Sequence, residues 1–352
     1  MKISAIICEF NPIHSGHKRL IDYAKTFSDK VVCIMSGNFV QRGMPACADK
    51  FSRAKHAVLC GADMVVELPT IFAVSSAENF ALGGVKIAKQ IAADYLVFGS
   101  ECGNIDELSN AANLIENADV NKKIKQNMSE GLSYPKAVAK AVGSDILDKP
   151  NNVLAIEYLR AIQKTNCKLT PVTLQRNSDY HSAIAEAYAS STALRANKEL
   201  LDLYSFDFVE QDLVTTAEHD YKQFACRYLS LLNNEQWQTI EGVSEGIENR
   251  FIRADKSRGY DNLTEQVKTK RYTLAKIQRI VLNAVLGITS DKVEKTKQKT
   301  QRVVPLAVKK SSETLLERTF GQSDDTTTKA DRLYYSLTGK SAPTKLQVIA
   351  ER

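Results

Sequence analysis

Short apolar runs of β type alternate with stretches of helical periodicity through the first hundred residues, and this alternation restricts the fold more than any other feature. A strand, a helix and a further strand in succession are typical of βαβ units on a parallel sheet. The pattern continues to a helix start around Ser190. It predicts an α/β, Rossmann-like fold. The expected strands are Ile3–Cys8, Val31–Met35, Met64–Val66, Tyr95–Phe98 and Val172–Gln175, and the expected helices are Lys18–Thr26, Lys50–Cys60, Glu78–Ile91 and Val153–Lys164.

The strand pattern fades beyond Leu200, where long polar and helical stretches such as Asn262–Leu286 dominate. We therefore expect two domains, one at residues 1–200 that holds the sheet and one at residues 201–352 that is mainly helical. A chain of 352 residues, of which 43% are apolar, is long enough to give each domain a core.

The basic charge is concentrated in the second domain. Residues 251–310 contain fifteen Lys or Arg and five Asp or Glu, a net +10, whereas the whole chain has a net charge of +6. A cluster of basic side chains interrupted by Tyr272 can line one side of a helix, as expected for a surface that binds a nucleic-acid backbone. A solvated helix face is the structural alternative. The residues of this cluster are Lys268, Lys270, Arg271, Lys276 and Arg279.

The sequence predicts no membrane segment, because no apolar run reaches the roughly 18 to 20 residues that cross a bilayer. We expect a cytoplasmic protein. The seven cysteines are widely spaced without a C-x-x-C pair, which argues against both a disulfide framework and a structural zinc site.

The strongest chemical signal follows the first expected strand, where His14-Ser15-Gly16-His17 stands before a helix. Two imidazoles three residues apart at a helix N-terminus lie on one side, and the helix dipole there favours anions. Such a site suits nucleotide phosphates. It would catalyse a reaction by positioning the reactants and by donating hydrogen bonds to the phosphate as negative charge develops in the transition state. The alternatives are structural histidines and zinc ligands, although no third or fourth ligand has a suitable spacing.

A second phosphate-type element is the run Ser190-Ser191-Thr192-Ala193-Leu194-Arg195 at the start of a later helical stretch. Hydroxyl groups and backbone N–H groups gather at such a helix start, and Arg195 can grip a phosphate with two parallel hydrogen bonds. An ordinary helix cap with a surface arginine is the alternative.

These two elements together resemble the HIGH-type nucleotidyltransferase superfamily, and longer blocks resemble its tRNA(Met) cytidine acetate ligase family. The blocks are Glu9–His17, Met35–Gly43, Val66–Pro69, Phe98–Glu101, Pro150–Leu159, Glu245–Arg250 and Lys268–Thr273. One departure from the family pattern is a Lys-rich stretch, expected to be a linker, that follows Leu286 and contains Lys292, Lys295, Lys297 and Lys299.

The resemblance implies an ATP-dependent ligase that converts acetate into acetyl-adenylate and pyrophosphate. It then transfers the acetyl group to N4 of the wobble cytidine (position 34) of elongator tRNA(Met), giving N4-acetylcytidine. The implied catalytic residues are His14, His17 and Arg195, the implied co-substrate is ATP, and no metal is expected to be held by the protein. Whether Mg²⁺ accompanies the ATP is left open by the sequence. The residues implied to bind ATP are Ile7, Cys8, Glu9, Phe10, Asn11, Pro12, Ile13, His14, Ser15, Gly16, His17, Lys18, Arg19, Leu20, Gly99, Asn151, Asn152, Arg176, Ser191, Thr192 and Arg195.

Two other functions compete with this one. An adenylyltransferase that joins ATP to a small phosphorylated metabolite would account for the first domain but not for the basic segment. A non-catalytic RNA-binding protein would be expected to lack His14, His17 or Arg195, and the sequence contains all three.

Overall fold

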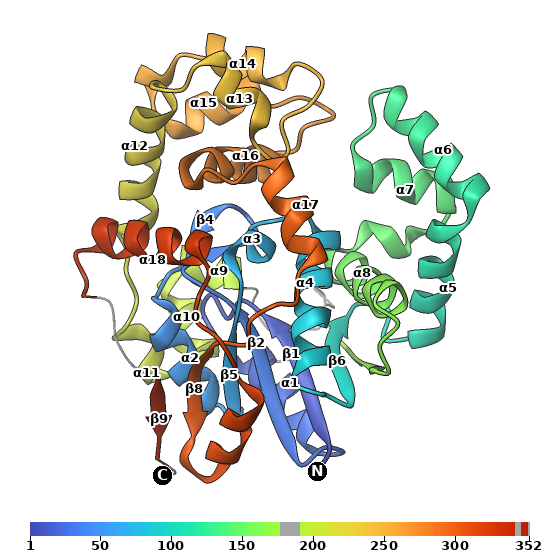
Figure 1. Ribbon diagram of the computed structural model, residues 1–352, viewed down its shortest axis with the longest axis vertical. Coiled ribbons are helices and arrows are strands. Elements are labelled where there is room, and N and C mark those ends of the chain that lie inside the picture. Colours follow the sequence, from blue (N-terminus) through green and yellow to red (C-terminus); the bar gives the residue numbers. More distant parts are fainter. Residues whose placement is uncertain (177–190, 342–345, 351–352) are drawn as a thin grey trace.

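A seven-stranded sheet forms the centre of the molecule in the computed structural model, which describes residues 1–176, 191–341 and 346–350 (Figure 1). The strands are β1 (Ile3–Cys8), β2 (Lys30–Ser36), β5 (Met64–Leu68), β6 (Tyr95–Ser100), β7 (Thr170–Gln175), β8 (Pro305–Lys309) and β9 (Gln347–Ile349). Their spatial order is β7-β6-β1-β2-β5-β8-β9, and the first five of these are parallel. Strand β8 runs antiparallel to β5, and β9 runs parallel to β8.

Helices cover both faces of the sheet, because alternate residues of each buried strand point to opposite sides. The helices of this part of the chain are α1 (Ser15–Lys25), α2 (Lys50–Leu59), α3 (Thr70–Ala73), α4 (Ala77–Gln90), α5 (Ile105–Glu116), α6 (Ala118–Ser129), α7 (Tyr134–Val142), the 3₁₀ turn η1 (Asp145–Asp148) and α8 (Pro150–Lys164). In β1, Ile3 and Ile7 belong to the core under α4 and α8, whereas Ile6 belongs to the core under α1 and α2. A small helical unit, α5 to α7, projects beside α8 (Figure 1).

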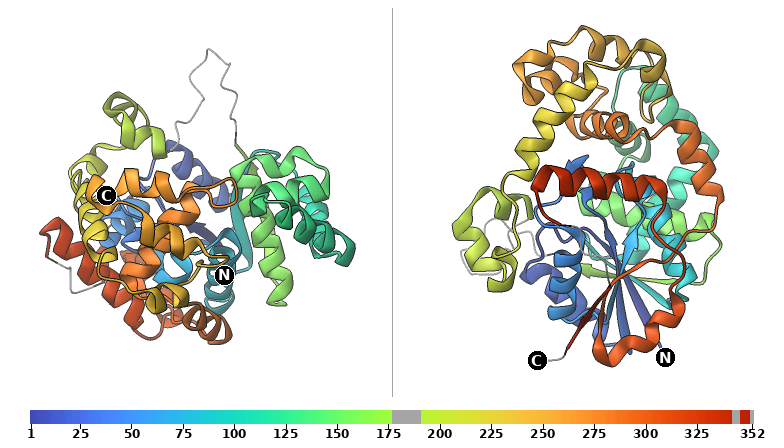
Figure 2. Two further views of the ribbon diagram at one scale, coloured as in Figure 1. Left: turned by 90° about the horizontal axis from the view of Figure 1, so that it is seen from above. Right: turned by 60° about the vertical axis from the view of Figure 1, so that its left-hand side comes forward.

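The chain after residue 190 is mostly helical. Its helices are α9 (Ser191–Ala196), α10 (Lys198–Tyr204), α11 (Asp207–Glu210), α12 (Ala217–Leu229), α13 (Asn234–Thr239), α14 (Ile247–Arg253), η2 (Lys256–Arg258), α15 (Tyr260–Val267), α16 (Leu274–Leu286), α17 (Ser290–Gln298), η3 (Lys310–Arg318) and α18 (Asp325–Thr338). A helical layer stands beyond the carboxyl ends of the parallel strands, and α18 lies between this layer and the sheet (Figure 2, right). A short hairpin of β3 (Phe39–Val40) and β4 (Met44–Pro45) lies below α16 (Figure 1).

The predicted α/β class is confirmed, and each strand predicted between Ile3 and Gln175 is present in a parallel sheet. The domain boundary at residue 200 stays a prediction, but the sheet does not end there. Strands β8 and β9 return to it from the C-terminal part of the chain, because the short run at Leu306–Val308 is fully apolar and buries against β5. The stretch at 290–298, expected to be a linker, is helix α17, which is capped by Thr289. None of the described helices is long and apolar enough to span a bilayer.

Candidate active site

The candidate site lies at the carboxyl ends of β1, β6 and β7, where the strand order reverses direction. The chain passes from β1 to β2 on one side of the sheet and later to β6 and β7 on the other. In open α/β sheets ligands bind at such a reversal point, outside the carboxyl ends of the strands. The loop after β1, Gly99 in β6 and Arg176 after β7 all meet at this edge.

The loop after β1 brings the first histidine to the N-terminus of α1. His14 is the N-cap residue, and its Nδ1 accepts a hydrogen bond from the Gly16 N–H at 3.1 Å. Because Nδ1 accepts, the proton of the neutral ring is assigned to Nε2, which is then a donor. The bond between Asn11 and Pro12 before it is cis. The Asn11 side chain holds this backbone in place, because its oxygen accepts from the Cys47 N–H at 2.7 Å.

The two imidazoles are neighbours, as the spacing predicts. Their ring centroids are 3.8 Å apart, and the Phe10 ring packs edge-on against His17. Burial and then the Arg176 charge lower the pKa of His14 to about 4, and burial, His14 and Arg176 hold the pKa of His17 well below its ordinary value. Both rings are therefore neutral at pH 7.

Two buried polar atoms in the first turn of α1 have no hydrogen-bond partner within the described chain, namely Nδ1 of His17 and Oγ of Ser15. A buried polar atom of this kind is rare in folded proteins and is commonly satisfied by a ligand or by water. Their position at a helix N-terminus fits an anionic ligand.

The aliphatic stem of the Arg176 side chain packs against Gly99. A Cβ atom on Gly99 would stand 3.1 Å from Cγ and 3.2 Å from Cδ of Arg176, so the glycine makes room for the arginine stem. Burial lowers the pKa of Arg176 and the Glu101 carboxylate partly offsets this, which places a largely desolvated cation beside the two imidazoles.

We predict that Gly99→Ala raises the KM for ATP by about fivefold. The added methyl group overpacks Arg176 at a cost of about 1 kcal/mol, which corresponds to about fivefold in affinity. Steady-state kinetics over a range of ATP concentrations measures this, with far-UV circular dichroism as the control for folding. An unchanged KM would show that Arg176 does not contact ATP.

Asn151 and Asn152 begin α8 and are tied to Glu101. The Glu101 carboxylate accepts from the Asn152 N–H at 2.8 Å and from the Asn151 side chain at 2.8 Å. In return, Oδ1 of Asn152 accepts from the backbone N–H groups of Glu101 and Cys102. Glu101 is thus a site residue that the sequence analysis did not single out, although its place directly after β6 is a signal.

The second phosphate-type segment lies against the loop after β1. The Arg195 guanidinium donates to the Asn11 carbonyl, and the Ser191 hydroxyl donates to the Pro12 carbonyl at 3.2 Å. Arg195 also contacts the Thr192 hydroxyl at 3.4 Å. The two segments lie far apart in the sequence and nevertheless contact each other at the candidate site. Ser190 lies outside the described residues.

Several residues expected around ATP pack in the core or contact other protein groups in this structure. Ile7 is buried in the core under α4 and α8. Ile13 is buried in the core under α1 and α2, and Leu20 packs against that core. The Cys8 thiol lies 3.7 Å from the Ile34 carbonyl. Lys18 pairs with Asp22 at 2.6 Å on the exposed side of α1. Their contacts with ATP stay predictions, as does that of Arg19.

The basic cluster does not line one helix, so that expectation is wrong. Lys268, Lys270 and Arg271 lie in the loop between α15 and α16, and only Lys276 and Arg279 belong to α16. The helix is interrupted because Thr273 caps α16 and the buried Tyr272 turns inward, where its hydroxyl donates to the Ser244 carbonyl at 2.6 Å.

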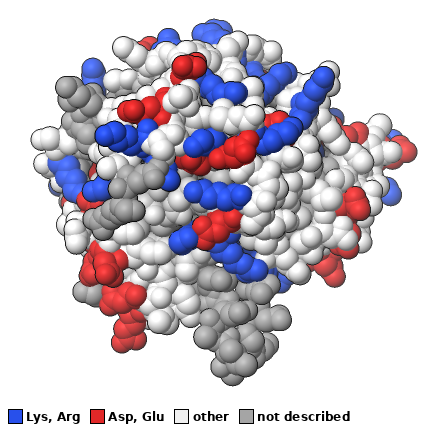
Figure 3. Space-filling view, turned by 90° about the horizontal axis from the view of Figure 1, so that it is seen from below, with Lys and Arg blue, Asp and Glu red and all other residues white. Residues whose placement is uncertain are grey.

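Most of these basic groups have partners within the protein. Lys268 pairs with Glu265 at 3.1 Å, Arg271 pairs with Glu245 at 2.6 Å, and Nζ of Lys276 lies 3.9 Å from the centre of the Tyr272 ring. Burial lowers the pKa of Arg279 to about 10. At the other end of the molecule, below the amino ends of the strands, Lys and Arg are interspersed with Asp and Glu (Figure 3).

Comparison with known proteins places the chain in a family. The sequence model described as HIGH Nucleotidyl Transferase matches residues 1–333. A tRNA(Met) cytidine acetate ligase of Caldicellulosiruptor bescii is 37% identical over 310 residues, covering 81% of this chain and 77% of the relative. One from Clostridium perfringens is 35% identical over 324 residues, covering 83% and 80%.

Two crystal structures of Thermotoga maritima TmcAL have the same fold. The structure bound with alpha-thio ATP has a TM-score of 0.81 and 28% identity, covering 90% of this chain and 82% of that protein. The apo structure has a TM-score of 0.82 and 25% identity, covering 97% and 96%. This chain therefore belongs to the HIGH nucleotidyl transferases and, among them, to the tRNA(Met) cytidine acetate ligase family.

Proposed function

We propose that this protein is an ATP-dependent ligase that activates acetate as acetyl-adenylate and transfers the acetyl group to N4 of the wobble cytidine of elongator tRNA(Met). The observation that carries the proposal is the contact between Arg195 and the loop of His14 and His17 at the carboxyl edge of the sheet. The cytoplasm, where tRNA is used, is the compartment that this function implies.

ATP fits the residues of this edge. The triphosphate would take the N-terminus of α1, where the unpartnered atoms of Ser15 and His17 lie, with Arg176 and Arg195 as the nearby cations. Mg²⁺ is the expected companion of the triphosphate. A relative of the same fold is solved with alpha-thio ATP, which supports this assignment.

In the first step an acetate oxygen attacks the α-phosphorus, an O–P bond forms and pyrophosphate leaves. Acetate carries its own negative charge, so the step needs charge neutralisation and alignment rather than a strong base. A neutral His14 donates from Nε2, and a neutral His17 can donate from one nitrogen. These hydrogen bonds strengthen as charge accumulates on the phosphate oxygens.

The substrate is tested by acetate-dependent exchange of pyrophosphate into ATP, with acetate, propionate and nicotinate mononucleotide offered separately. We expect exchange with acetate and at least about tenfold less with propionate, because a pocket fitted to a methyl group has no room for a further methylene. Exchange with nicotinate mononucleotide alone would identify a metabolite adenylyltransferase instead.

The basic loop before α16 is the surface we assign to tRNA. Replacing Lys270 and Arg271 with alanine is expected to weaken tRNA binding and to reduce the slope of log affinity against log salt by about 2, one for each lost phosphate contact. Acetate-dependent exchange should be unchanged. The matched control replaces Lys2 and Lys25, at the opposite end of the sheet, and is expected to alter neither quantity. Equal loss of both activities in the first variant would contradict the assignment.

A further inference from the structure

The β3–β4 hairpin carries a charged side chain to the junction between the ATP site and the helical layer. Its turn consists of Gln41, Arg42 and Gly43, and the hairpin lies directly below α16 (Figure 1). The hairpin thus lies between the loop that holds Glu9, directly after β1, and helix α16, which follows the basic loop.

The hairpin turn is fixed on both sides. On the site side, the Gln41 N–H donates to Oε1 of Glu9 at 2.6 Å. On the helical side, Gly43 has φ +75°, and a Cβ there would stand 2.6 Å from the carbonyl group of Gln278 in α16. This close approach of two backbones requires glycine and holds the turn against α16. The position of Arg42 between them is therefore well defined.

One carboxylate oxygen of Glu9 has no hydrogen-bond partner among the described residues. Within the described chain, the Gln41 N–H is the only hydrogen-bond donor to the Glu9 carboxylate, so the second carboxylate oxygen has no partner there. The nearest arginines are engaged elsewhere: Arg53 donates to backbone carbonyls, including that of Glu9 at 2.5 Å, and Arg195 donates to Asn11. Glu9 is thus a half-buried carboxylate that lacks an ion-pair partner among the described residues.

Arg42 supplies the opposite charge nearby. Its side chain is exposed, and within the described chain it makes neither a hydrogen bond nor an ion pair. Its charge nevertheless acts on the Glu9 carboxylate, as do those of Arg53 and Arg195. A hydrogen-bond acceptor and a forked donor are thus near enough to interact electrostatically, although they form no ion pair with each other.

This pair matches the hydrogen-bonding edge of cytosine. That edge presents the N4 amino donor beside the N3 and O2 acceptors, so a carboxylate can accept from N4 and a guanidinium can donate to N3 and O2. Uracil has a hydrogen-bond acceptor at the position of the amino group. That acceptor would lie against the carboxylate, which is also an acceptor, so no hydrogen bond could form. Building on the proposed function, we propose that Glu9 and Arg42 read the wobble cytosine and present its N4 to the acetyl-adenylate.

The pair also accounts for the proton of the second step. The N4 nitrogen forms a C–N bond to the acetyl carbonyl carbon, the C–O bond to the phosphate breaks, and AMP leaves with that electron pair. The N4 proton passes to the second oxygen of Glu9. Burial is the largest influence on the Glu9 carboxyl and raises its pKa, which increases its proton affinity.

The test is acetyl transfer to an anticodon stem-loop RNA in a single turnover, with acetate-dependent pyrophosphate exchange measured on the same preparations without RNA. We expect Arg42→Ala to reduce transfer by about tenfold or more while exchange stays within about twofold of wild type. Arg42→Lys should fail to restore transfer, because lysine lacks the planar fork. The control is Arg258→Ala, an exposed arginine of the helical layer that pairs with Asp255, and should leave both unchanged.

A second variant tests the choice of base. Competing stem-loops with cytidine or uridine at the wobble position should differ by about tenfold in inhibition of the wild type, and Glu9→Gln should reduce this preference to below about twofold. Wild-type transfer rates in Arg42→Ala, or an undiminished preference for cytidine in Glu9→Gln, would overturn the inference. Equal loss of exchange and transfer in Arg42→Ala would also overturn it. Absence of acetate-dependent exchange in the wild type would instead overturn the proposed function.

Discussion

Replacing His17 with alanine is expected to slow acetyl-adenylate formation by about 10²-fold or more, because removal of one preorganised donor at a developing charge has effects of this size. The ring is buried and neutral, it lies against His14, and one of its nitrogens has no partner among the described residues. A group arranged in this way contributes chiefly when a ligand supplies the missing partner. Acetate-dependent pyrophosphate exchange measures the step without tRNA.

The matched control is His219→Ala. His219 is an exposed residue of α12 whose ring is hydrogen-bonded to the Gln223 side chain, and its loss should leave the exchange rate unchanged. If the His17 variant retained a rate within about twofold of wild type, His17 would have no part in the reaction. A rate lost together with the circular dichroism spectrum would instead indicate unfolding, so the spectrum is recorded for each variant.

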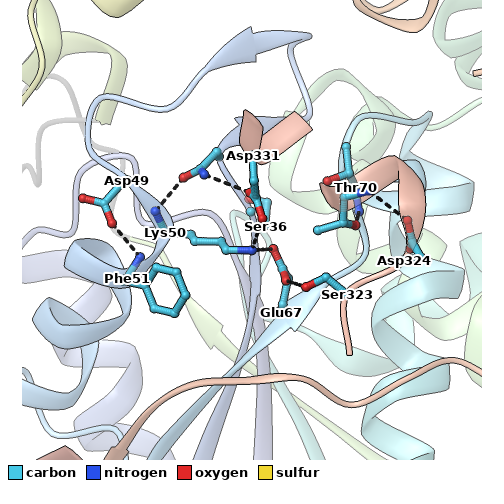
Figure 4. A network of polar contacts seen from close by, with 12 residues as sticks. Ser36, Asp49, Lys50, Phe51, Glu67, Thr70, Ser323, Asp324 and Asp331 are labelled. Atoms are coloured by element: carbon cyan, nitrogen blue, oxygen red, sulfur yellow. Dashed lines mark hydrogen bonds and ion pairs between the residues drawn. The ribbon is translucent and has the colours of Figure 1, made fainter. Parts of the chain in front are cut away.

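Replacing Lys50 with alanine is expected to lower the free energy of unfolding by about 3 to 5 kcal/mol, the usual effect of breaking a buried ion pair from one side. The Lys50 ammonium lies between Glu67 of β5 at 2.7 Å and Asp331 of α18 at 2.6 Å (Figure 4). Its side chain is 4% exposed and that of Glu67 is 2% exposed. Burial alone would lower the pKa of Lys50, but the two carboxylates raise it, so the group stays charged.

Without Lys50, two carboxylates would share a site from which water is largely excluded, and α18 would lose the ion pair between Asp331 and Lys50. Urea denaturation followed by circular dichroism measures the change. The control is Lys295→Ala, since Lys295 and Asp291 form an exposed pair on α17 and its removal should alter the free energy of unfolding by less than about 1 kcal/mol. A similarly small change for Lys50→Ala would contradict the role we give to this cluster.

The parallel sheet could be predicted because its strands are buried on both faces and therefore appear as short continuous apolar runs. Ile3–Cys8 has this pattern and forms β1 with the predicted bounds. The return of the chain to the sheet could not be predicted in the same way. Strand β8 is short and pairs with β5, which lies far from it in the sequence. No local sequence pattern therefore predicts the pairing.

The proximity of His14 and His17 was also predictable, since they are close in sequence and their spacing at the start of a helix places them on one side. The interruption of the basic helix was not. Lys268 to Thr273 have no proline or glycine to end a helix, and the break depends on the tertiary contact of Tyr272 with Ser244. The excess of Lys and Arg over residues 251–310 indicates a basic segment, but the partners that neutralise Lys268 and Arg271 become visible only in the folded chain.

The central claim is that the loop after β1 and the segment Ser191–Arg195 bind the same triphosphate. A crystal structure of this protein with a non-hydrolysable ATP analogue tests it most directly. The account predicts α-phosphate oxygens within about 3.5 Å of an imidazole nitrogen of His14 or His17 and a phosphate oxygen within the same distance of the Arg195 guanidinium. A triphosphate bound at another edge of the sheet, with Arg195 still attached to the Asn11 carbonyl and the His17 nitrogen without a ligand, would contradict it.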